Sequence, residues 1–339
     1  MNYHRYILKR LIFLIFVLIG ASLISFFIVR VVPGDPARMM LPPQASPKDV
    51  ARMRVELGLD EPYYVQYFNY ISNILQGDLG FSHHTGRPVL EEFKRKLPAS
   101  LELSILSLLL AGVVGIWLGV ISAINKNKFI DHFARVFSIG GISAPGFWIG
   151  LLTIYFFYYR LGWLPAPSGR LDILTENINQ ITITNIYLLD AVLTRNWFFF
   201  KNAFLHLLLP VTVLSYSFLA MICRLTRGGM LEVLDSDYIN FFRTNGVKKR
   251  RVIWIYALRN AVRPVLTMMG MFFARLLGGV VFIETVFNWP GIGRYAVDSI
   301  KFLDYPPIQG FIIFMALGYV LVYLIVDLLY MVLDPRVKY

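Results

Sequence analysis

Residues able to perform catalysis are few in this sequence and poorly placed for it. Gly141-Ile142-Ser143-Ala144 has the Gly-x-Ser-x form of intramembrane serine proteases, whose serine needs a nearby histidine to accept its proton. The best candidate base is His206. Ser143 is expected roughly 10 Å from the inner end of one apolar segment, and His206 at the outer end of the next. Close helix packing through small residues explains the motif better, so we predict no catalytic site.

Patterns for metal or nucleotide binding are also missing. The sequence contains neither a Gly-x-x-x-x-Gly-Lys-[Ser/Thr] phosphate loop nor a His-Glu-x-x-His zinc motif. His83-His84 is the one histidine cluster, and neighbouring residues on a strand point to opposite faces. We therefore expect a solvated turn there, with no metal and no cofactor. The single cysteine, Cys223, rules out a disulfide framework.

The composition indicates a membrane protein. Of the 339 residues, 57% are hydrophobic and only 16% are charged, whereas soluble domains are about 45–50% apolar and about 25% charged. This excludes intrinsic disorder. The net charge of +12 is explained by membrane orientation rather than by nucleic-acid binding, because the basic residues gather in particular short loops.

Six apolar segments are long enough to cross a bilayer, which needs about 20 residues. The first resembles a signal peptide, but it is longer than a typical apolar core and no small-x-small cleavage site follows it, so we interpret it as a retained anchor. The predicted spans are 11–29, 103–124, 136–159, 204–223, 265–287 and 308–333. An all-α membrane protein with six transmembrane helices is therefore expected.

Basic residues in the short loops predict that both termini lie inside. With this orientation the inner segments hold 17 Lys and Arg residues and the two short outer loops hold six, as the positive-inside rule requires. The predicted organisation is an N-terminal segment with the first span (1–32), an extracytoplasmic cap (33–100), a core of spans two to six (101–333) containing an inner loop (224–263), and a cytoplasmic tail (334–339).

The inner loop 224–263 is suited to docking a partner. Asp235, Ser236 or Asp237 is expected to cap a short helix, and Asn245-Gly246 to end it. Phe241 and Phe242 are large apolar side chains of the kind that anchor interfaces. An amphipathic hairpin lying on the membrane is the alternative interpretation.

Motifs along the whole chain carry a family resemblance. The loop contains Asp237-Tyr238-Ile239, Arg243, Gly246, 257–261 (ALRNA) and Pro264, and further motifs follow one another at 30–37 (RVVPGDPA), 57–62 (LGLDEP), 77–80 (GDLG), 97–103 (LPASLEL), 162–165 (GWLP), 284–287 (ETVF), 290–293 (PGIG) and 333–336 (LDPR). Together they resemble ABC transporter permeases, most closely the dipeptide/oligopeptide/nickel branch. The Glu-Ala-Ala that names the coupling loop of these permeases is replaced by Asn240-Phe241-Phe242.

The resemblance implies a type I ABC importer permease fold in a prokaryotic cytoplasmic (inner) membrane. It further implies a second, usually non-identical permease chain, two ABC ATPase subunits inside, and an extracytoplasmic solute-binding protein. The chain itself is then not an enzyme, since ATP hydrolysis belongs to the partner subunits, and the missing phosphate loop agrees with this. No nucleic-acid partner is expected.

Two groups of candidate residues follow. Those assigned to ATPase coupling surround the 235–247 loop: Glu232, Asp237, Tyr238, Phe241, Phe242, Arg243 and Gly246. Those assigned to the translocation path lie on the fifth predicted span, where a charge near mid-bilayer usually faces a cavity or bundle interior: Met268, Phe272, Arg275 and Glu284. Plain packing is the favoured explanation for the methionine and aromatic side chains.

The cargo is the least determined feature. Di- and oligopeptides are the expected cargo; nickel chelates and oligosaccharides, which other members of the branch carry, are the alternatives. A stand-alone secondary transporter is a different class of function, and it would need its own ion relay within the spans. The few charged residues there fall at different depths, which disfavours such a relay.

Overall fold

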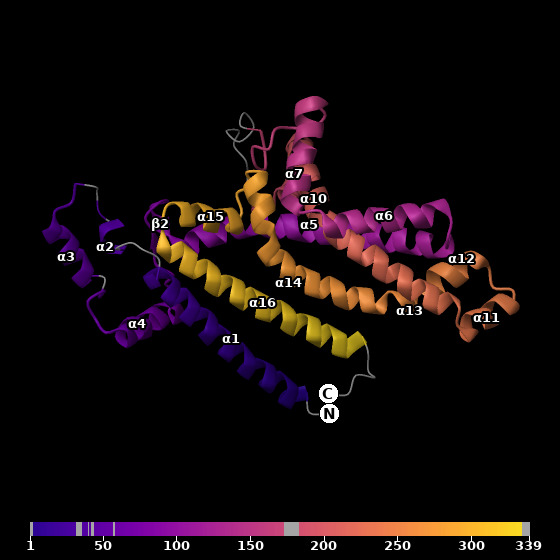
Figure 1. Cartoon of the computed structure of the whole chain (residues 1–339), viewed down its shortest axis with the longest axis horizontal. Coiled ribbons are helices and arrows are strands. Elements are labelled where there is room, and N and C mark those ends of the chain that lie inside the picture. Colours follow the sequence, from indigo (N-terminus) through magenta and orange to yellow (C-terminus); the bar gives the residue numbers. More distant parts are fainter. Residues whose placement is uncertain are drawn as a thin grey trace. The chain divides into compact units, whose positions relative to one another are not determined.

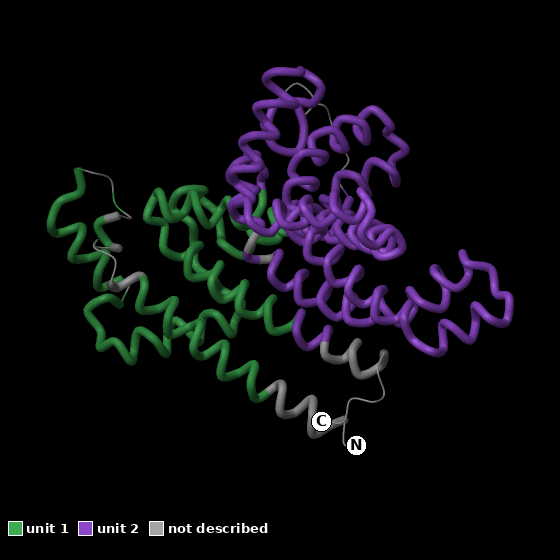
Figure 2. Tube along the Cα trace, turned by 45° about the vertical axis from the view of Figure 1, so that its right-hand side comes forward, with its two compact units in different colours: residues 1–97, 291–321 green, residues 98–290, 322–339 purple. Residues whose placement is uncertain are grey.

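Helices make up most of the chain, as the composition predicts. The computed structural model describes the backbone of residues 3–31, 36–39, 41, 44–56, 58–172 and 183–333. Side chains are described for residues 12–28, 37–38, 41, 44–56, 58–172, 183–276, 278 and 280–326. The chain divides into two compact units, residues 1–97 with 291–321 and residues 98–290 with 322–339, coloured separately in Figure 2.

Unit 1 (1–97, 291–321) combines a long apolar helix with short amphipathic elements. These elements are α1 (Tyr3–Val31), α2 (Pro36–Met39), α3 (Pro47–Glu56), α4 (Tyr63–Leu75), the hairpin of β1 (Phe81–Ser82) and β2 (Arg87–Pro88), and α15 (Ile292–Lys301). Ser46 caps α3 by accepting the backbone N–H of Asp49 at its hydroxyl oxygen. In return, the Ser46 hydroxyl and backbone N–H donate to the Asp49 carboxylate, and these hydrogen bonds lower the pKa of that carboxyl. Val89, Phe93, Ile292 and Tyr295 form a core cluster.

Unit 2 (98–290, 322–339) is a bundle of long helices. It contains α6 (Phe129–Ser143), α7 (Gly146–Thr153), the π-helical turn η1 (Ile154–Arg160), α9 (Tyr187–Leu193), α10 (Trp197–Leu234), α11 (Asp237–Thr244), α12 (Lys249–Arg251), the π-helical turn η2 (Val252–Ala257), α13 (Leu258–Ala261) and α14 (Arg263–Val286). Two helices run through the unit boundary, α5 (Val89–Ile124) and α16 (Tyr305–Leu333). Figure 1 labels most of these elements.

Glycines allow the helices of unit 2 to approach closely. A Cβ added at Gly119 of α5 would lie 2.7 Å from the carbonyl oxygen of Cys223 on α10. A Cβ at Gly141 of α6 would lie 2.8 Å from Cβ of Ala220. Gly141 therefore packs closely against α10, as the packing explanation of its motif predicts, whereas Ser143 is exposed. His206 instead lies 3.4 Å from the Asp172 carboxylate and 2.9 Å from the Asn202 carbonyl oxygen.

The observed spans differ in detail from the predicted ones. Among the described residues, three helices are long and apolar enough to cross a membrane, or five if each bent pair counts as one span. The predicted span 136–159 is two helices that meet at 107° next to Pro145, because proline cannot continue the hydrogen-bond ladder of α6. α5 starts at Val89, fourteen residues before the expected 103, and passes through Pro98. The count of six spans stays a prediction.

Candidate functional site

A short helix, α11, projects beyond the long helices of unit 2, at the lower right of Figure 1. Its inner face is fixed by Ile239, which is fully buried in a cluster with Met230, Leu234, Val252 and Ala257. These residues come from α10 and η2, so the helix is attached at both of its flanks. α11 is therefore packed against the end of α10.

One aromatic stack and one hydrogen bond hold α11 against the following segment. The ring of Phe242 stacks on Tyr256 of η2, with 4.0 Å between centroids and an interplanar angle of 17°. The amide of Asn260 on α13 donates to the Tyr238 hydroxyl at 2.7 Å. Phe242 and Tyr238 thus position α11, and Phe242 is only partly available to a partner.

The outer face of α11 presents Phe241. This side chain is 63% exposed, although burying a phenylalanine is favourable by about 1.5–3 kcal/mol. The charged side chains of Asp237 and Arg243, and that of Glu232 on the last turns of α10, are also exposed. One large apolar side chain among charged neighbours is the arrangement of an interface hot spot with a polar rim.

The ends of α11 test the capping predictions. The helix starts after Ser236, as expected, but no side-chain cap forms, because the Ser236 hydroxyl donates backwards to the carbonyl oxygen of Val233. That part of the prediction is wrong. The predicted stop is confirmed: Gly246 has φ +71°, and the N–H groups of Gly246 and Val247 donate to the carbonyls of Arg243 and Phe242. This pair of bonds is a Schellman motif.

A buried charge cluster lies where α5, α6 and α10 meet. The Asp131 carboxylate is fully buried and accepts two hydrogen bonds from Arg227, Nε at 2.6 Å and Nη2 at 2.9 Å. It also accepts the Ser122 hydroxyl and the backbone N–H of Asn127. The sequence analysis missed this cluster, because Asp131 and Arg227 each resemble an ordinary solvated loop residue in the sequence. Their position at the ends of apolar segments is the signal that could have found them.

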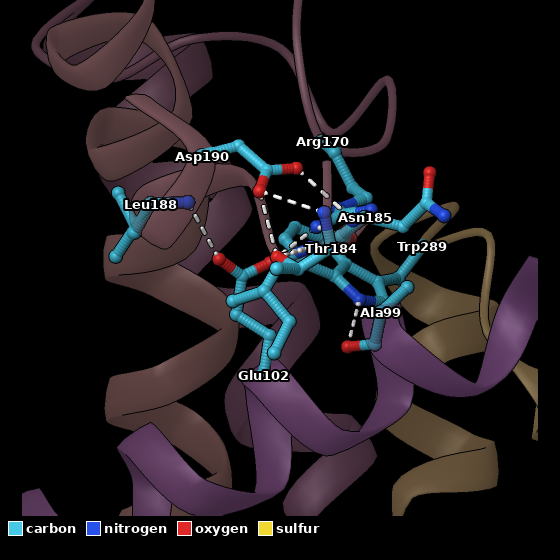
Figure 3. A network of polar contacts seen from close by, with 9 residues as sticks. Ala99, Glu102, Arg170, Thr184, Asn185, Leu188, Asp190 and Trp289 are labelled. Carbon is cyan, nitrogen blue, oxygen red and sulfur yellow. Dashed lines mark hydrogen bonds and ion pairs between the residues drawn. The ribbon is translucent and has the colours of Figure 1, made fainter. Parts of the chain in front are cut away.

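At another end of unit 2, a second buried network anchors the loop between η1 and α10 (Figure 3). Arg170 donates from Nη2 to Glu102 of α5 at 2.5 Å and to the carbonyl oxygen of Asn185 at 2.9 Å. Its guanidinium carbon lies 3.3 Å from the centroid of the Tyr187 ring. Glu102 also accepts the N–H of Leu188. Both charged side chains are buried, so each needs the other to offset the cost of its removal from water. Together they anchor the loop.

Two further residues complete this network. Asp190 is buried and accepts the backbone N–H groups of Thr184 and Asn185 together with the Thr184 hydroxyl. Trp289, also fully buried, donates its indole N–H to the carbonyl oxygen of Ala99 at 3.0 Å (Figure 3). The motif at 97–103 contains Glu102, but nothing in the sequence pairs it with Arg170, 68 positions away.

The residues assigned to the translocation path do not form one surface. Arg275 is exposed on α14 and Met268 is half-buried. Phe272 is 5% exposed and packs against Phe218, with 5.1 Å between ring centroids. Glu284 is fully buried and accepts the Ser100 hydroxyl at 2.5 Å. Arg275 is therefore the member most open to cargo in this chain.

Two family models together match nearly the whole chain. Residues 115–339 match the family described as the binding-protein-dependent transport system inner membrane component, and residues 3–104 match its N-terminal counterpart.

Curated relatives resemble the chain over almost their full length. A protein of Escherichia coli named "Probable D,D-dipeptide transport system permease protein" is 45% identical, with 96% of this chain and 94% of that protein covered. The dipeptide transport system permease protein of Alkalihalophilus pseudofirmus is 42% identical, with 98% and 99% covered. The glutathione transport system permease protein of Escherichia coli is 37% identical, with 98% and 99% covered.

Proposed function

The chain belongs to the family of inner membrane components of binding-protein-dependent transport systems, and from this premise we propose that it passes di- and oligopeptides through an ATP-driven importer. It is an integral permease of a bacterial inner membrane and acts with ATPase subunits and a substrate-binding protein. The single observation that supports the peptide cargo is the set of three relatives described above, at 37–45% identity, which are named for D,D-dipeptides, for dipeptides and for glutathione, itself a tripeptide.

The proposed architecture has six spans with both termini inside and a cap at 33–100 on the outside. A second, non-identical permease chain would complete the pore. The apolar helices α1, α5, α10, α14 and α16 support five of these spans, and the bent pair of α6 and α7 supports the remaining one. The 17 basic residues of the inner segments support the orientation.

The proposed coupling element is the 235–247 segment with Glu232. Closure of the ATPase pair would press on Phe241 and its charged rim of Glu232, Asp237 and Arg243. Ile239 and the Phe242–Tyr256 stack would carry the displacement into α10 and η2, since a packed core moves as a rigid element. Rocking of the spans between inward-open and outward-open states would follow.

Reconstitution tests the function. The chain is placed in vesicles with its second permease chain, its ATPases and its binding protein, and uptake of a radiolabelled dipeptide is measured. ATP inside and binding protein outside should both be required. Uptake by this chain alone, driven by an ion gradient and indifferent to ATP, would contradict the proposal and favour a secondary transporter.

Gly246 is expected to tolerate asparagine better than alanine. Its φ of +71° costs about 1–2 kcal/mol for most L-residues, while asparagine visits this region more readily. No atom lies within 4 Å of a Cβ placed there, so the penalty is conformational and not steric. Gly246→Ala should weaken ATPase binding about 5–30-fold, and Gly246→Asn less, in a titration of the purified permease. Equal affinities for both variants would show that the Schellman motif does not position the coupling helix.

Arg275 is expected to affect transport and leave assembly intact. The side chain is exposed on α14 and makes no ion pair with a described residue. Arg275→Ala should therefore lower uptake of peptides bearing a free C-terminal carboxylate while the complex purifies at normal yield. Arg294→Ala on α15 is the matched control. Unchanged uptake of several peptides would reduce Arg275 to a packing role.

A further inference from the structure

Unit 2 contains a cavity of about 420 Å³ between α6 and α10, near the buried Asp131–Arg227 pair. This volume is within the range of about 300–1,000 Å³ found for small-molecule sites. Its lining combines basic, hydroxyl and apolar side chains, among them Arg135, Ser138, Ile139, Cys223, Arg224 and Arg227. None of these residues belongs to the proposed coupling surface or to the proposed path.

The cavity has an excess of positive charge. Arg227 is neutralised by the two hydrogen bonds to Asp131. Arg135 lies 3.8 Å from the same carboxylate, which is already saturated by Arg227, Ser122 and the Asn127 backbone. Arg224 is exposed and has no ion-pair partner among the described residues. The Nη2 group of Arg135 also lies 2.9 Å from Nδ1 of His132. The guanidinium of Arg224 and the remaining N–H groups of Arg135 are therefore left to bind an anion, and arginine geometry suits phosphate oxygens.

A buried hydroxyl points to the same kind of ligand. Ser138 is 5% exposed, and its Oγ has no hydrogen-bond partner among the described nitrogen and oxygen atoms; the Cys223 thiol, a weak hydrogen-bonding group, is its one polar neighbour within reach among the residues lining the cavity. Leaving a buried hydroxyl unpaired is costly, so such a group calls for a partner. An anionic oxygen in the cavity would accept its proton.

The side of the cavity along α6 is apolar and open. Val136, Ile139 and Ile142 are spaced by three residues on one face of α6 and are 70%, 64% and 48% exposed. The distribution of Lys and Arg residues among the loops predicts that the charged end of α6 lies at the inner membrane surface. Basic pockets between helices on that side attract the head groups of anionic lipids.

We propose that this cavity binds a phosphate group, and that its source is the head group of an anionic membrane lipid. Arg135 and Arg224 bind the phosphate oxygens, Ser138 donates to one of them, and an acyl chain lies along Val136, Ile139 and Ile142. The site is independent of the cargo and of ATP, and nothing in the proposed transport function requires it.

Lipid retention by the intact importer tests the site. The purified complex is titrated with phosphatidylglycerol, with phosphatidylcholine and with inorganic phosphate, and native mass spectrometry counts the bound molecules. The double variant Arg135→Gln/Arg224→Gln should lose phosphatidylglycerol about thirtyfold in affinity, because each basic group near an anionic surface contributes about a factor of five. Lys249→Gln/Arg250→Gln on α12 is the charge-matched control and should retain the lipid.

Each outcome decides the proposal. Saturable phosphatidylglycerol binding that the cavity variant loses and the α12 variant keeps supports a lipid head group. Saturable inorganic phosphate binding lost in the same variant, without lipid retention, supports a phosphate site filled from solution. Equal losses in both variants, equal binding of phosphatidylcholine, or no saturable binding would overturn the site. Ser138→Ala changes no charge and should lower the affinity for phosphatidylglycerol in the same assay. This result would keep the site testable even if the double variant misfolds.

Discussion

Replacing Phe241 by aspartate is expected to abolish ATPase binding and ATP-dependent uptake while the chain still inserts in the membrane. The ring is 63% exposed, so the substitution removes little packing from the permease itself, chiefly the edge contact with Phe242 at 5.9 Å between ring centroids. In the complex, it would place a charge where an apolar anchor belongs, and central anchors contribute about 2 kcal/mol or more. This corresponds to a loss of affinity of about thirtyfold or greater, measurable by co-purification of the tagged permease with its ATPases.

Two controls separate docking from general damage. Phe241→Leu keeps an apolar side chain and should keep most of the binding. Phe68→Asp changes an aromatic side chain of α4, in the proposed cap, that is 68% exposed and should leave ATPase binding unchanged. Recovery of ATPases at wild-type yield with Phe241→Asp would refute the coupling role of α11 and favour the membrane-lying hairpin.

Removing Arg170 is expected to cause a large loss of stability in unit 2. Arg170→Ala leaves Glu102 charged, buried and without its guanidinium partner, which typically costs about 3–5 kcal/mol. The stacking on Tyr187 and the hydrogen bond to Asn185 disappear as well. A lower midpoint for thermal unfolding of the detergent-solubilised protein is the expected result.

A double-mutant cycle identifies the cause. Arg170→Met/Glu102→Leu removes both charges and should recover a large part of the stability that Arg170→Ala loses, because a buried pair contributes little beyond what apolar packing would. Arg195→Ala, at an exposed position in the same loop, should change little. If the double variant is no more stable than Arg170→Ala, the guanidinium acts mainly through packing.

The features that the sequence predicted correctly are local ones. Apolar length indicated the helices, and Asn245-Gly246 indicated the end of α11, since a positive φ is a property of one residue and its immediate neighbours. Proline was a less reliable guide. Pro145 sits at a 107° bend, whereas α5 continues through Pro98.

The contacts between distant positions were not predictable from one sequence. Glu102 and Arg170 are 68 positions apart, and Asp131 and Arg227 are 96 apart. Each of these residues resembles a solvated loop charge when it is considered alone. Phe241 and Phe242 of the proposed coupling loop also looked equivalent in the sequence. Only the stack of Phe242 on Tyr256 distinguishes the internal ring from the exposed one.

The length of α10 has a mechanical consequence. Its 38 residues form one continuous helix of about 57 Å, which begins after Asn196, close in sequence to the loop held by Arg170, and ends at Leu234 beside α11. We expect such a helix to move as one rigid element, so that a displacement at one end reaches the other. Spectroscopic labels placed at its two ends should change orientation together during the ATP cycle, with no delay between the two.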